Sequence, residues 1–95
     1  MRQPAVYMMA NRRNGALYIG VTSNLPQRVH QHRESLTPGF TQRYGCKLLI
    51  YYERYEDMDG AIARERQLKA RSRARKLALI ETLNPDWRDL YEDFA

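Results

Sequence analysis

The sequence lacks several features by which a class of protein is often assigned. It has a single cysteine, Cys46, so no disulfide can form within the chain and nothing indicates an oxidising compartment. One cysteine and two histidines also fall short of a four-ligand zinc site of the usual kind. No apolar run is long enough to span a membrane and no signal peptide is visible, so we expect a cytoplasmic protein with no membrane partner.

Several common catalytic motifs are missing as well. The sequence contains neither the GxGxxG pattern of dinucleotide-binding domains nor a P-loop, and no Ser-His-Asp arrangement stands out. Internal repeats, low-complexity tracts and linkers are also absent. The 95 residues therefore indicate one small domain, 1–95, whose hydrophobic content of 43% is ordinary for a globular protein.

Negative charge is in the minority. The 16 Lys and Arg residues outnumber the 11 Asp and Glu residues, which gives a net charge of +5. An excess of positive charge fits a polyanionic partner, either nucleic acid or an anionic membrane surface. The basic residues crowd into 64–76, whereas the last ten residues are rich in acids. A solvated helix face is the alternative interpretation of the basic run.

A β-hairpin is predicted at the start of the chain. Residues 4–10 and 17–22 have the character of strands, and the Asn14-Gly15 pair between them is a strong signal for a hairpin turn. A domain of this size has a thin core, because it buries only about 60–65% of the surface of its unfolded chain. Polar side chains that point inward from these strands therefore need a specific reason.

The hairpin register decides which side chains of the two strands meet. Side chains alternate between the two faces of a strand. If the register pairs Ala10 with Gly15, Tyr7 falls opposite Tyr18 and the two rings share a face. Two tyrosines on one face of a small sheet are then the first candidate functional residues.

A first helix is predicted to begin near Asn24 or Leu25. Asn24 can cap the helix, and Pro26 suits its first turn. Its apolar stripe consists of Leu25, Val29 and Leu36.

This helix carries both histidines of the chain. At about 100° per residue, His32 falls inside the apolar stripe and His30 falls on the far side. Arg28 lies four residues before His32, on the same flank of the helix. The geometry thus favours His32 as the histidine that points inward, with Arg28 beside it.

The remaining segments complete an α+β domain. Residues 73–83 are expected to turn Leu77, Ile80 and Leu83 inward, and Asn84 is expected to cap a last short helix that contains Trp87, Leu90, Tyr91 and Phe94. The predicted order is strand, strand, helix, strand, helix, helix, helix, with helices covering a small, three-stranded, mostly antiparallel sheet. The segments not yet named are a polar loop at 40–45, a third strand at 46–54 and a helix from 57–59 to about 72.

Glu65 is the most unusual residue in this pattern. It lies near the middle of the apolar face of the helix that ends at about 72, and a carboxylate in a thin core is costly unless it is paired or binds a metal. One interpretation is a salt bridge to Lys69 or to an arginine of the same helix. The other is a ligand for a divalent cation, for which carboxylate oxygen is the expected donor.

Tyr7, Tyr18, Arg28 and His32 each have a structural and a functional interpretation. Strand tyrosines usually serve in packing, but a phenol has a pKa of about 10, and nearby cations would lower that pKa and make the phenol a usable general base. Arg28 is either a surface charge or the group that holds a phosphate. His32 is either a hydrogen-bonded core residue or a group that orders water, holds a tyrosine or shuttles a proton.

These residues follow one another in the pattern of a nuclease family. Tyr18-Ile19-Gly20 comes after an upstream strand that carries Val6-Tyr7-Met8, and Arg28 and His32 follow it. Glu65 then lies in the second helix. Over nearly its whole length the chain resembles the GIY-YIG endonuclease superfamily, with Val6 at the position of the first motif glycine and Gly20 as the second.

The resemblance is greatest to stand-alone, single-domain bacterial members of that superfamily. These members share the Gly-Phe-Thr segment at 39–41 and the Asn-Pro-x-Trp ending at 84–87. The superfamily often has a further asparagine on a late helix. Asn84 is the late candidate for that catalytic asparagine, and a helix N-cap is the alternative interpretation of it.

The resemblance implies a metal-dependent DNA endonuclease. One Mg²⁺ or Mn²⁺ ion is expected on Glu65 as its only protein ligand, and Arg28 is expected to clamp the phosphate. Tyr7 is slightly favoured as the general base that activates water, with Tyr18 and His32 positioning the water and the phosphate. The reverse assignment of the two tyrosines stays open.

Basic side chains are expected to hold the DNA backbone without regard to sequence. Because no second domain is visible to read a target, the choice of target is expected to come from DNA structure or damage, as in DNA repair or recombination, from a homodimer, or from a targeting partner. Two other functions are considered: a non-catalytic nucleic-acid-binding module on the same fold, and an interaction protein with no nucleic-acid role. The candidate DNA-binding residues are Arg12, Arg13, Arg43, Lys47, Lys69, Arg71 and Arg73.

Overall fold

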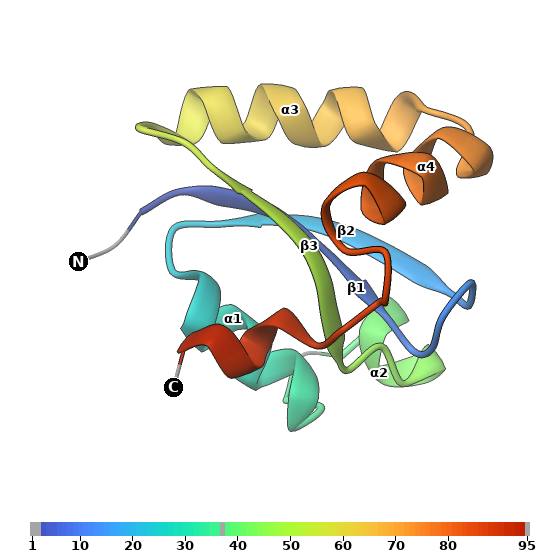
Figure 1. Cartoon of the computed structure of the whole chain (residues 1–95). Coiled ribbons are helices and arrows are strands. Elements are labelled where there is room, and N and C mark those ends of the chain that lie inside the picture. Colours follow the sequence, from blue (N-terminus) through green and yellow to red (C-terminus); the bar gives the residue numbers. More distant parts are fainter. Residues whose placement is uncertain (1–2, 37, 95) are drawn as a thin grey trace.

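Three strands form an antiparallel sheet in the computed structural model, which describes residues 3–36 and 38–94 (Figure 1). The strands are β1 (Ala5–Ala10), β2 (Leu17–Thr22) and β3 (Leu48–Arg54), and β1 lies between the other two. β1 pairs with each neighbour in the antiparallel sense. The predicted α+β class and antiparallel sheet are confirmed, although β3 begins at Leu48 and not at residue 46.

The register of the β1–β2 hairpin differs from the predicted one. Ala10 pairs with Leu17, and Tyr7 pairs with Gly20 and not with Tyr18. Relative to the prediction, the second strand is displaced by two residues, and an even displacement leaves every side chain on its original face. The rings of Tyr7 and Tyr18 therefore still share a face, with their centroids 6.2 Å apart.

The loop of this hairpin explains the displacement. The side chain of Asn11 accepts a hydrogen bond from the backbone N–H of Ala16 at 2.9 Å, so the loop closes before Gly15 can join the strand pairing. Within it, Gly15 N–H donates to the carbonyl of Arg12 at 3.0 Å. Asn14 adopts the left-handed region with φ of 58°, which asparagine tolerates better than most residues. The predicted hairpin is present, but its turn is centred on Arg13 and Asn14, with Gly15 as the last turn residue, and the loop is longer than predicted.

Helix α1 (Leu25–Arg33) begins where the sequence predicts and ends earlier. The side chain of Asn24 accepts a hydrogen bond from a backbone N–H of the first turn and caps the helix. Ser35, with φ of 55°, then turns the chain away from the helix axis. Leu36 is 64% exposed, so its predicted place in the apolar stripe is wrong.

A short helix, α2 (Phe40–Tyr44), occupies the segment for which the sequence predicts a polar loop. That prediction is wrong. The helix has five residues, and Thr41 is the one that is buried. So short an element shows no apolar periodicity, which is the signal on which helix prediction depends.

Two longer helices follow β3. α3 (Met58–Ala70) begins after its N-cap Asp57 and packs on β2 and β1, and α4 (Arg73–Leu83) continues from it (Figure 1). Both helices are confirmed, with α3 ending slightly before residue 72. Ile80 is buried as predicted. Leu83 is 61% exposed, contrary to the prediction, because it is the last residue of α4.

The segment after α4 does not start a helix at Asn84. Asn84 is the C-cap of α4, and its backbone N–H donates to the carbonyl of Ile80 at 2.7 Å, so the predicted N-cap is wrong. Trp87 has φ of 55°, which a continuing right-handed helix does not allow. The last element is a 3₁₀ helix, η1 (Leu90–Phe94), shorter than the predicted amphipathic helix.

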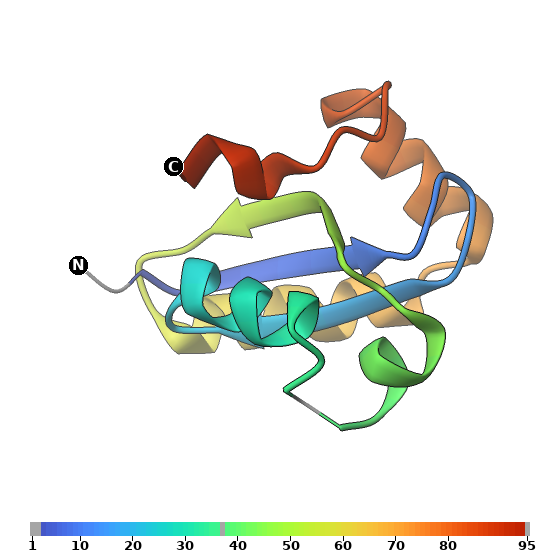
Figure 2. The same cartoon turned by 90° about the horizontal axis from the view of Figure 1, so that it is seen from below.

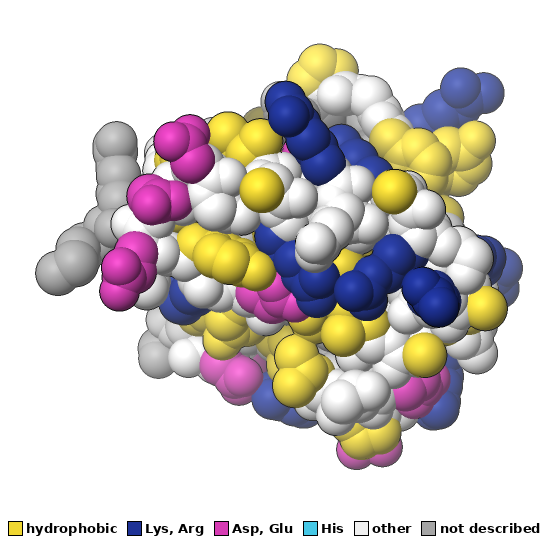
Figure 3. All heavy atoms as spheres, turned by 90° about the horizontal axis from the view of Figure 1, so that it is seen from above, with side chains coloured by type: hydrophobic (Ala, Val, Ile, Leu, Met, Phe, Trp, Pro, Cys, Tyr) yellow, Lys and Arg dark blue, Asp and Glu magenta, His cyan; other side chains and the backbone are white. Residues whose placement is uncertain are grey.

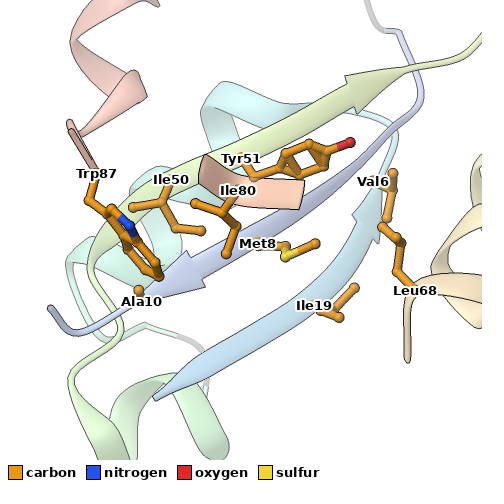
Figure 4. Close-up of a cluster of buried hydrophobic side chains, with 9 residues drawn as sticks. All are labelled: Val6, Met8, Ala10, Ile19, Ile50, Tyr51, Leu68, Ile80 and Trp87. Atoms are coloured by element: carbon orange, nitrogen blue, oxygen red, sulfur yellow. The ribbon is translucent and has the colours of Figure 1, made fainter. Parts of the chain in front are cut away.

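Helices cover both faces of the sheet, with α3 and α4 on one side and α1 and η1 on the other (Figures 1 and 2). All six residues of β1 are buried, because both faces of the sheet are covered. Since side chains alternate between the two faces of a strand, these residues belong to two separate clusters. The cluster under α3 and α4 contains Val6, Met8, Ala10, Ile19, Ile50, Tyr51, Leu68, Ile80 and Trp87 (Figure 4). The cluster beneath α1 contains Ala5, Tyr7, Met9, Leu25, Val29, Cys46 and Leu49.

None of the helices in the described ranges is long and apolar enough to cross a membrane.

Candidate active site

The phenol of Tyr7 and the imidazole of His32 form a buried hydrogen bond. Tyr7 Oη lies 2.7 Å from His32 Nε2, and the two side chains come from β1 and α1. Tyr7 is fully buried and His32 is 2% exposed, whereas His30 faces solvent. The prediction that His32 is the inward-pointing histidine is confirmed, and its partner is one of the two candidate tyrosines.

His32 is held on its other side by Thr41 of α2. His32 Nδ1 lies 2.9 Å from Thr41 Oγ1, and Thr41 is 4% exposed. If Nδ1 carries the hydrogen and donates to Thr41, Nε2 accepts the hydrogen bond of the Tyr7 phenol. Both ring nitrogens then have a partner, and the ring orientation is set from α1, α2 and β1 together.

Gly20 makes room for the tyrosines. A Cβ atom at this position would lie 2.6 Å from Tyr7 Oη and 2.9 Å from Tyr18 Cε2, closer than real Cβ contacts come. The Tyr7 ring therefore passes across the backbone of β2 at the one point where there is no side chain. The geometry explains why a glycine, and not merely a small residue, follows Tyr18-Ile19.

Tyr18 closes the cluster on its outer side. Its ring centroid lies 5.4 Å from that of His32 and 6.2 Å from that of Tyr7. Unlike Tyr7, Tyr18 is only partly buried. In the free protein the site thus has one phenol that is sealed from solvent and one that is partly exposed.

The electrostatics of the cluster contradict one expectation from the sequence. Burial raises the pKa of the Tyr7 phenol well above its ordinary value, and the neighbouring Tyr18 and Glu65 raise it further, while Arg28 lowers it only in part. Burial, helped by the positive charge of Arg28, lowers the pKa of His32. Nearby cations therefore do not make Tyr7 a phenolate, and both Tyr7 and His32 are neutral in the folded protein at neutral pH.

Arg28 and Glu65 lie at the rim of this cluster. Both are partly buried, and their charges act on Tyr7, as the directions of the pKa shifts indicate. The Glu65 side chain is 17% exposed, and its Oε2 lies 3.4 Å from Lys69 Nζ. The salt-bridge interpretation of Glu65 is therefore realised, but its partner Lys69 is 55% exposed and sits at the surface.

Within residues 3–36 and 38–94, no three His, Cys, Asp or Glu side chains gather where they could hold a metal ion. Glu65 therefore belongs to no such cluster in this part of the chain. Carboxylate oxygen is a donor that Mg²⁺ prefers. Glu65 could therefore contribute one ligand to a hard divalent cation.

The structure does not bring Asn84 to the other site residues. Its amide donates to the carbonyls of Ile50 at 3.1 Å and Arg88 at 2.8 Å and accepts from Arg88 N–H at 3.0 Å. These bonds hold the chain end against β3, which is the edge of the sheet opposite Gly20 on β2. All of the Asn84 amide is used in folding, and we assign it no part in catalysis.

The candidate DNA-binding residues fall into two groups. Basic side chains gather over α3 and α4 on one face of the molecule (Figure 3). There Lys69 and Arg71 end α3, while Arg73 donates to the carbonyls of Asn14 and Gly15 at 2.7 Å and so ties the hairpin loop to α4. The others are Arg12 and Arg13 in the hairpin loop, Arg43 on α2 and exposed Lys47.

Sequence reasoning missed the contacts that α2 makes with the site. Thr41 binds His32, and Phe40 stacks on Tyr18 with centroids 6.2 Å apart and an interplanar angle of 29°. In the sequence, the Gly-Phe-Thr segment at 39–41 indicates only a resemblance to other members of the superfamily. Because α2 reaches the site by tertiary packing, no periodic signal in the sequence marks either contact.

Comparison with known proteins identifies the family of this chain. The profile of the GIY-YIG catalytic domain matches residues 3–78. A UPF0213 protein from Clostridium perfringens is 34% identical over 67 residues, which cover 70% of this chain and 72% of that protein. A UPF0213 protein from Staphylococcus haemolyticus is 31% identical over 81 residues, which cover 85% and 98%. The chain belongs to the GIY-YIG family, a family of nucleases.

A solved structure shares the fold. The solution NMR structure of a UPF0213 protein from Bacillus halodurans aligns with a TM-score of 0.55 and 19% sequence identity. The alignment covers 94% of this chain and 93% of that one. It confirms the fold along almost the whole chain.

Proposed function

We propose that this protein is a metal-dependent DNA endonuclease whose active site consists of Tyr7, Tyr18, Arg28, His32 and Glu65. One observation carries the proposal: a buried phenol–imidazole pair, Tyr7 and His32, lies within the electrostatic reach of a partly buried arginine and a partly buried carboxylate. The family membership supports the nuclease class.

Arg28 is the proposed phosphate-binding group. Its guanidinium is always charged and presents donors in a fork that suits two phosphate oxygens at once. Its charge lowers the pKa values of both Tyr7 and His32, so it lies close enough to act on a group bound beside them. A cation held there before the reaction stabilises the negative charge that develops on the phosphate during in-line attack.

The proton is proposed to move through the buried pair. Because the free protein buries Tyr7 completely, the attacking water must reach its hydroxyl when DNA is bound. That water gives up a proton to Tyr7 Oη as it attacks phosphorus, and the Tyr7 hydroxyl proton passes along the 2.7 Å hydrogen bond to His32 Nε2. The phenol never has to ionise alone, which its raised pKa would oppose. Thr41 keeps Nε2 as the accepting nitrogen by receiving the Nδ1 hydrogen.

Glu65 is the proposed metal ligand, and a bound Mg²⁺ or Mn²⁺ ion would supply positive charge to the phosphate and the leaving oxygen. Lys69 neutralises Glu65 in the free protein and can move into solvent when another cation takes its place, because its own side chain is 55% exposed. One carboxylate binds Mg²⁺ weakly, so we expect poor metal affinity in the absence of DNA.

The test is a cleavage assay on plasmid, single-stranded and branched DNA with Mg²⁺, Mn²⁺ or EDTA. Wild type should cleave at least one substrate with a divalent ion and none in EDTA, and Glu65→Gln should remove cleavage. Glu56→Gln is the matched control, since Glu56 is an exposed glutamate ahead of α3. Cleavage that survives Glu65→Gln would overturn the assignment of Glu65. Salt-sensitive binding of DNA without any cleavage would instead indicate a non-catalytic binding module.

A further inference from the structure

A groove opens directly beside the candidate active site. It has a volume of about 290 Å³ and is lined by Leu17, Tyr18, Ile19, Phe40, Lys69 and Lys76. Two of these residues connect the groove to the site: Tyr18 belongs to the site, and Lys69 pairs with Glu65. We call this cavity the Phe40 groove, and a group bound in it would lie next to the site.

Aromatic rings continue from the site into the groove and beyond it. Phe40 stacks on Tyr18 with an interplanar angle of 29°, and its centroid lies 4.6 Å from that of Tyr44. Phe40 is 42% exposed and Tyr44 is 46% exposed. Both are large hydrophobic side chains that are exposed to solvent. Because their rings are in contact next to Tyr18, they form a patch and are not scattered surface residues.

Positive charge flanks these rings. Lys69 and Lys76 line the groove, and the guanidinium of Arg43 lies 5.7 Å from the Tyr44 ring centroid. The groove therefore combines an apolar lining with two lysines, and an arginine lies over the adjoining Tyr44 ring. A nucleotide has this chemistry, with an apolar face on the base and negative charge on the backbone.

We propose that the Phe40 groove binds an unpaired nucleobase of the substrate strand, and that the enzyme therefore prefers single-stranded DNA, or unpaired segments within duplex DNA, over perfect duplex. In a duplex the face of each base is covered by its stacked neighbours, so Phe40 has nothing to stack on until the base is unpaired. Backbone contacts to duplex DNA need only the basic residues and leave the apolar lining without a role. This inference rests on the proposed nuclease function, because it names the substrate of that site.

The test measures binding separately from cleavage. In the Glu65→Gln background with EDTA, fluorescence anisotropy gives dissociation constants for a labelled oligonucleotide, single-stranded or annealed to its complement. Phe40→Leu keeps an apolar side chain on the partly exposed position but removes the ring. It should weaken single-strand binding about 5- to 150-fold, the range typical of a lost base–aromatic stack. Duplex binding should change less than about twofold.

Two variants sharpen the comparison. Phe40→Trp keeps an aromatic face and should retain single-strand affinity. Leu83→Ala alters an exposed apolar residue at the end of α4 and should change neither affinity. Equal losses on single-stranded and duplex DNA, or no loss with Phe40→Leu, would overturn the proposal. Loss of single-strand binding with Phe40→Trp as well would also overturn it, because stacking would then not be the interaction.

Cleavage assays with the natural Glu65 separate this inference from the nuclease proposal. Preferential cleavage of single-stranded DNA by wild type, reduced by Phe40→Leu, supports both. Cleavage with no preference and no effect of Phe40→Leu retains the nuclease and overturns the groove. Phe40-dependent single-strand binding with no cleavage under any metal condition retains the groove as a base site and overturns the nuclease.

Discussion

Tyr7 lies opposite Gly20 in the sheet, and a Cβ atom at position 20 would approach the Tyr7 hydroxyl oxygen to 2.6 Å. The absence of one side chain on β2 is therefore what allows the buried phenol to reach His32. This relationship connects the most recognisable tripeptide of the sequence with the hydrogen bond at the centre of the site.

Gly20→Ala tests that relationship. The added methyl group must displace the Tyr7 ring, which is fully buried, so we expect a loss of about 1–3 kcal/mol in the free energy of unfolding, measured by urea denaturation. Gly60→Ala is the control, because its Cβ would meet only the side chains of Asp57 and Tyr55, at 3.2 and 3.3 Å, and should cost less. Equal stability of wild type and Gly20→Ala would contradict the close approach.

Thr41→Val tests the role of α2 in positioning His32. The change removes the partner of a buried ring nitrogen, and we expect it to cost about 1–3 kcal/mol of stability. We also expect a lower kcat with little change in KM, because Thr41 orients His32 without touching DNA. Thr41→Ser keeps the hydroxyl and should restore kcat. A Thr41→Ser variant as impaired as Thr41→Val would indicate that packing of the methyl group matters instead.

His32 predicts how stability depends on pH. Its pKa in the folded protein lies below the ordinary value of 6.5, so the unfolded chain binds more protons between the two values. The contribution of His32 to the stability of the folded protein is therefore fully present above pH 6.5. It is lost as the pH falls from 6.5 toward the pKa of His32 in the folded protein. As the pH is lowered through this window, the midpoint of thermal unfolding should fall in wild type and in His30→Gln. In His32→Gln the midpoint should depend less on pH. A midpoint that does not change in wild type would contradict the shift.

Glu53 predicts a stability effect that is separate from catalysis. Its carboxylate accepts hydrogen bonds from Tyr51 and Tyr55 and pairs with Arg64 at 2.9 Å. Burial alone would raise the pKa of Glu53, but these bonds bring it below its ordinary value. Glu53→Ala removes the acceptor of the Tyr51 and Tyr55 hydroxyls and the ion-pair partner of Arg64, so we expect a loss of about 1–3 kcal/mol in the free energy of unfolding.

The control for Glu53→Ala is Glu56→Ala, which alters an exposed side chain and should have little effect on urea denaturation. Cleavage at a temperature where both variants are folded should match wild type. A loss of cleavage with an unchanged midpoint would place the Glu53 cluster in the active site and contradict its structural role.

Several features could be predicted from the sequence because local signals carry them. The Asn-Gly pair that indicates the hairpin, the capping residue Asn24 and the helical spacing of Ile80 are local, and the elements they predict are present. His32 was distinguished from His30 by position on the helix alone. The ordered set of Tyr7, Tyr18, Arg28, His32 and Glu65 indicated the family before any geometry was available, and the roles of these residues remain predictions.

Other features escaped because they depend on contacts between distant segments. The hairpin register follows from the side chain of Asn11, and the burial of Thr41 follows from where α2 packs. The sequence around Asn84 fits either the start of a new helix or the end of the preceding one. Only the hydrogen bonds of Asn84 to Ile50 and Arg88, which depend on the tertiary structure, distinguish the two. Leu36 and Leu83 match an apolar stripe in sequence, but α1 ends before Leu36 and Leu83 is the last residue of α4, so both side chains are exposed.

The sequence by itself determined the fold class, the family and a set of candidate site residues, because spacing along strands and helices depends only on backbone geometry. The tertiary structure decided the protonation of that site. Cations close to Tyr7 suggest a lowered pKa, yet full burial outweighs Arg28 and raises it. Desolvation depends on how completely neighbouring segments exclude water, and that is a property of the packed molecule that no pattern along the chain contains.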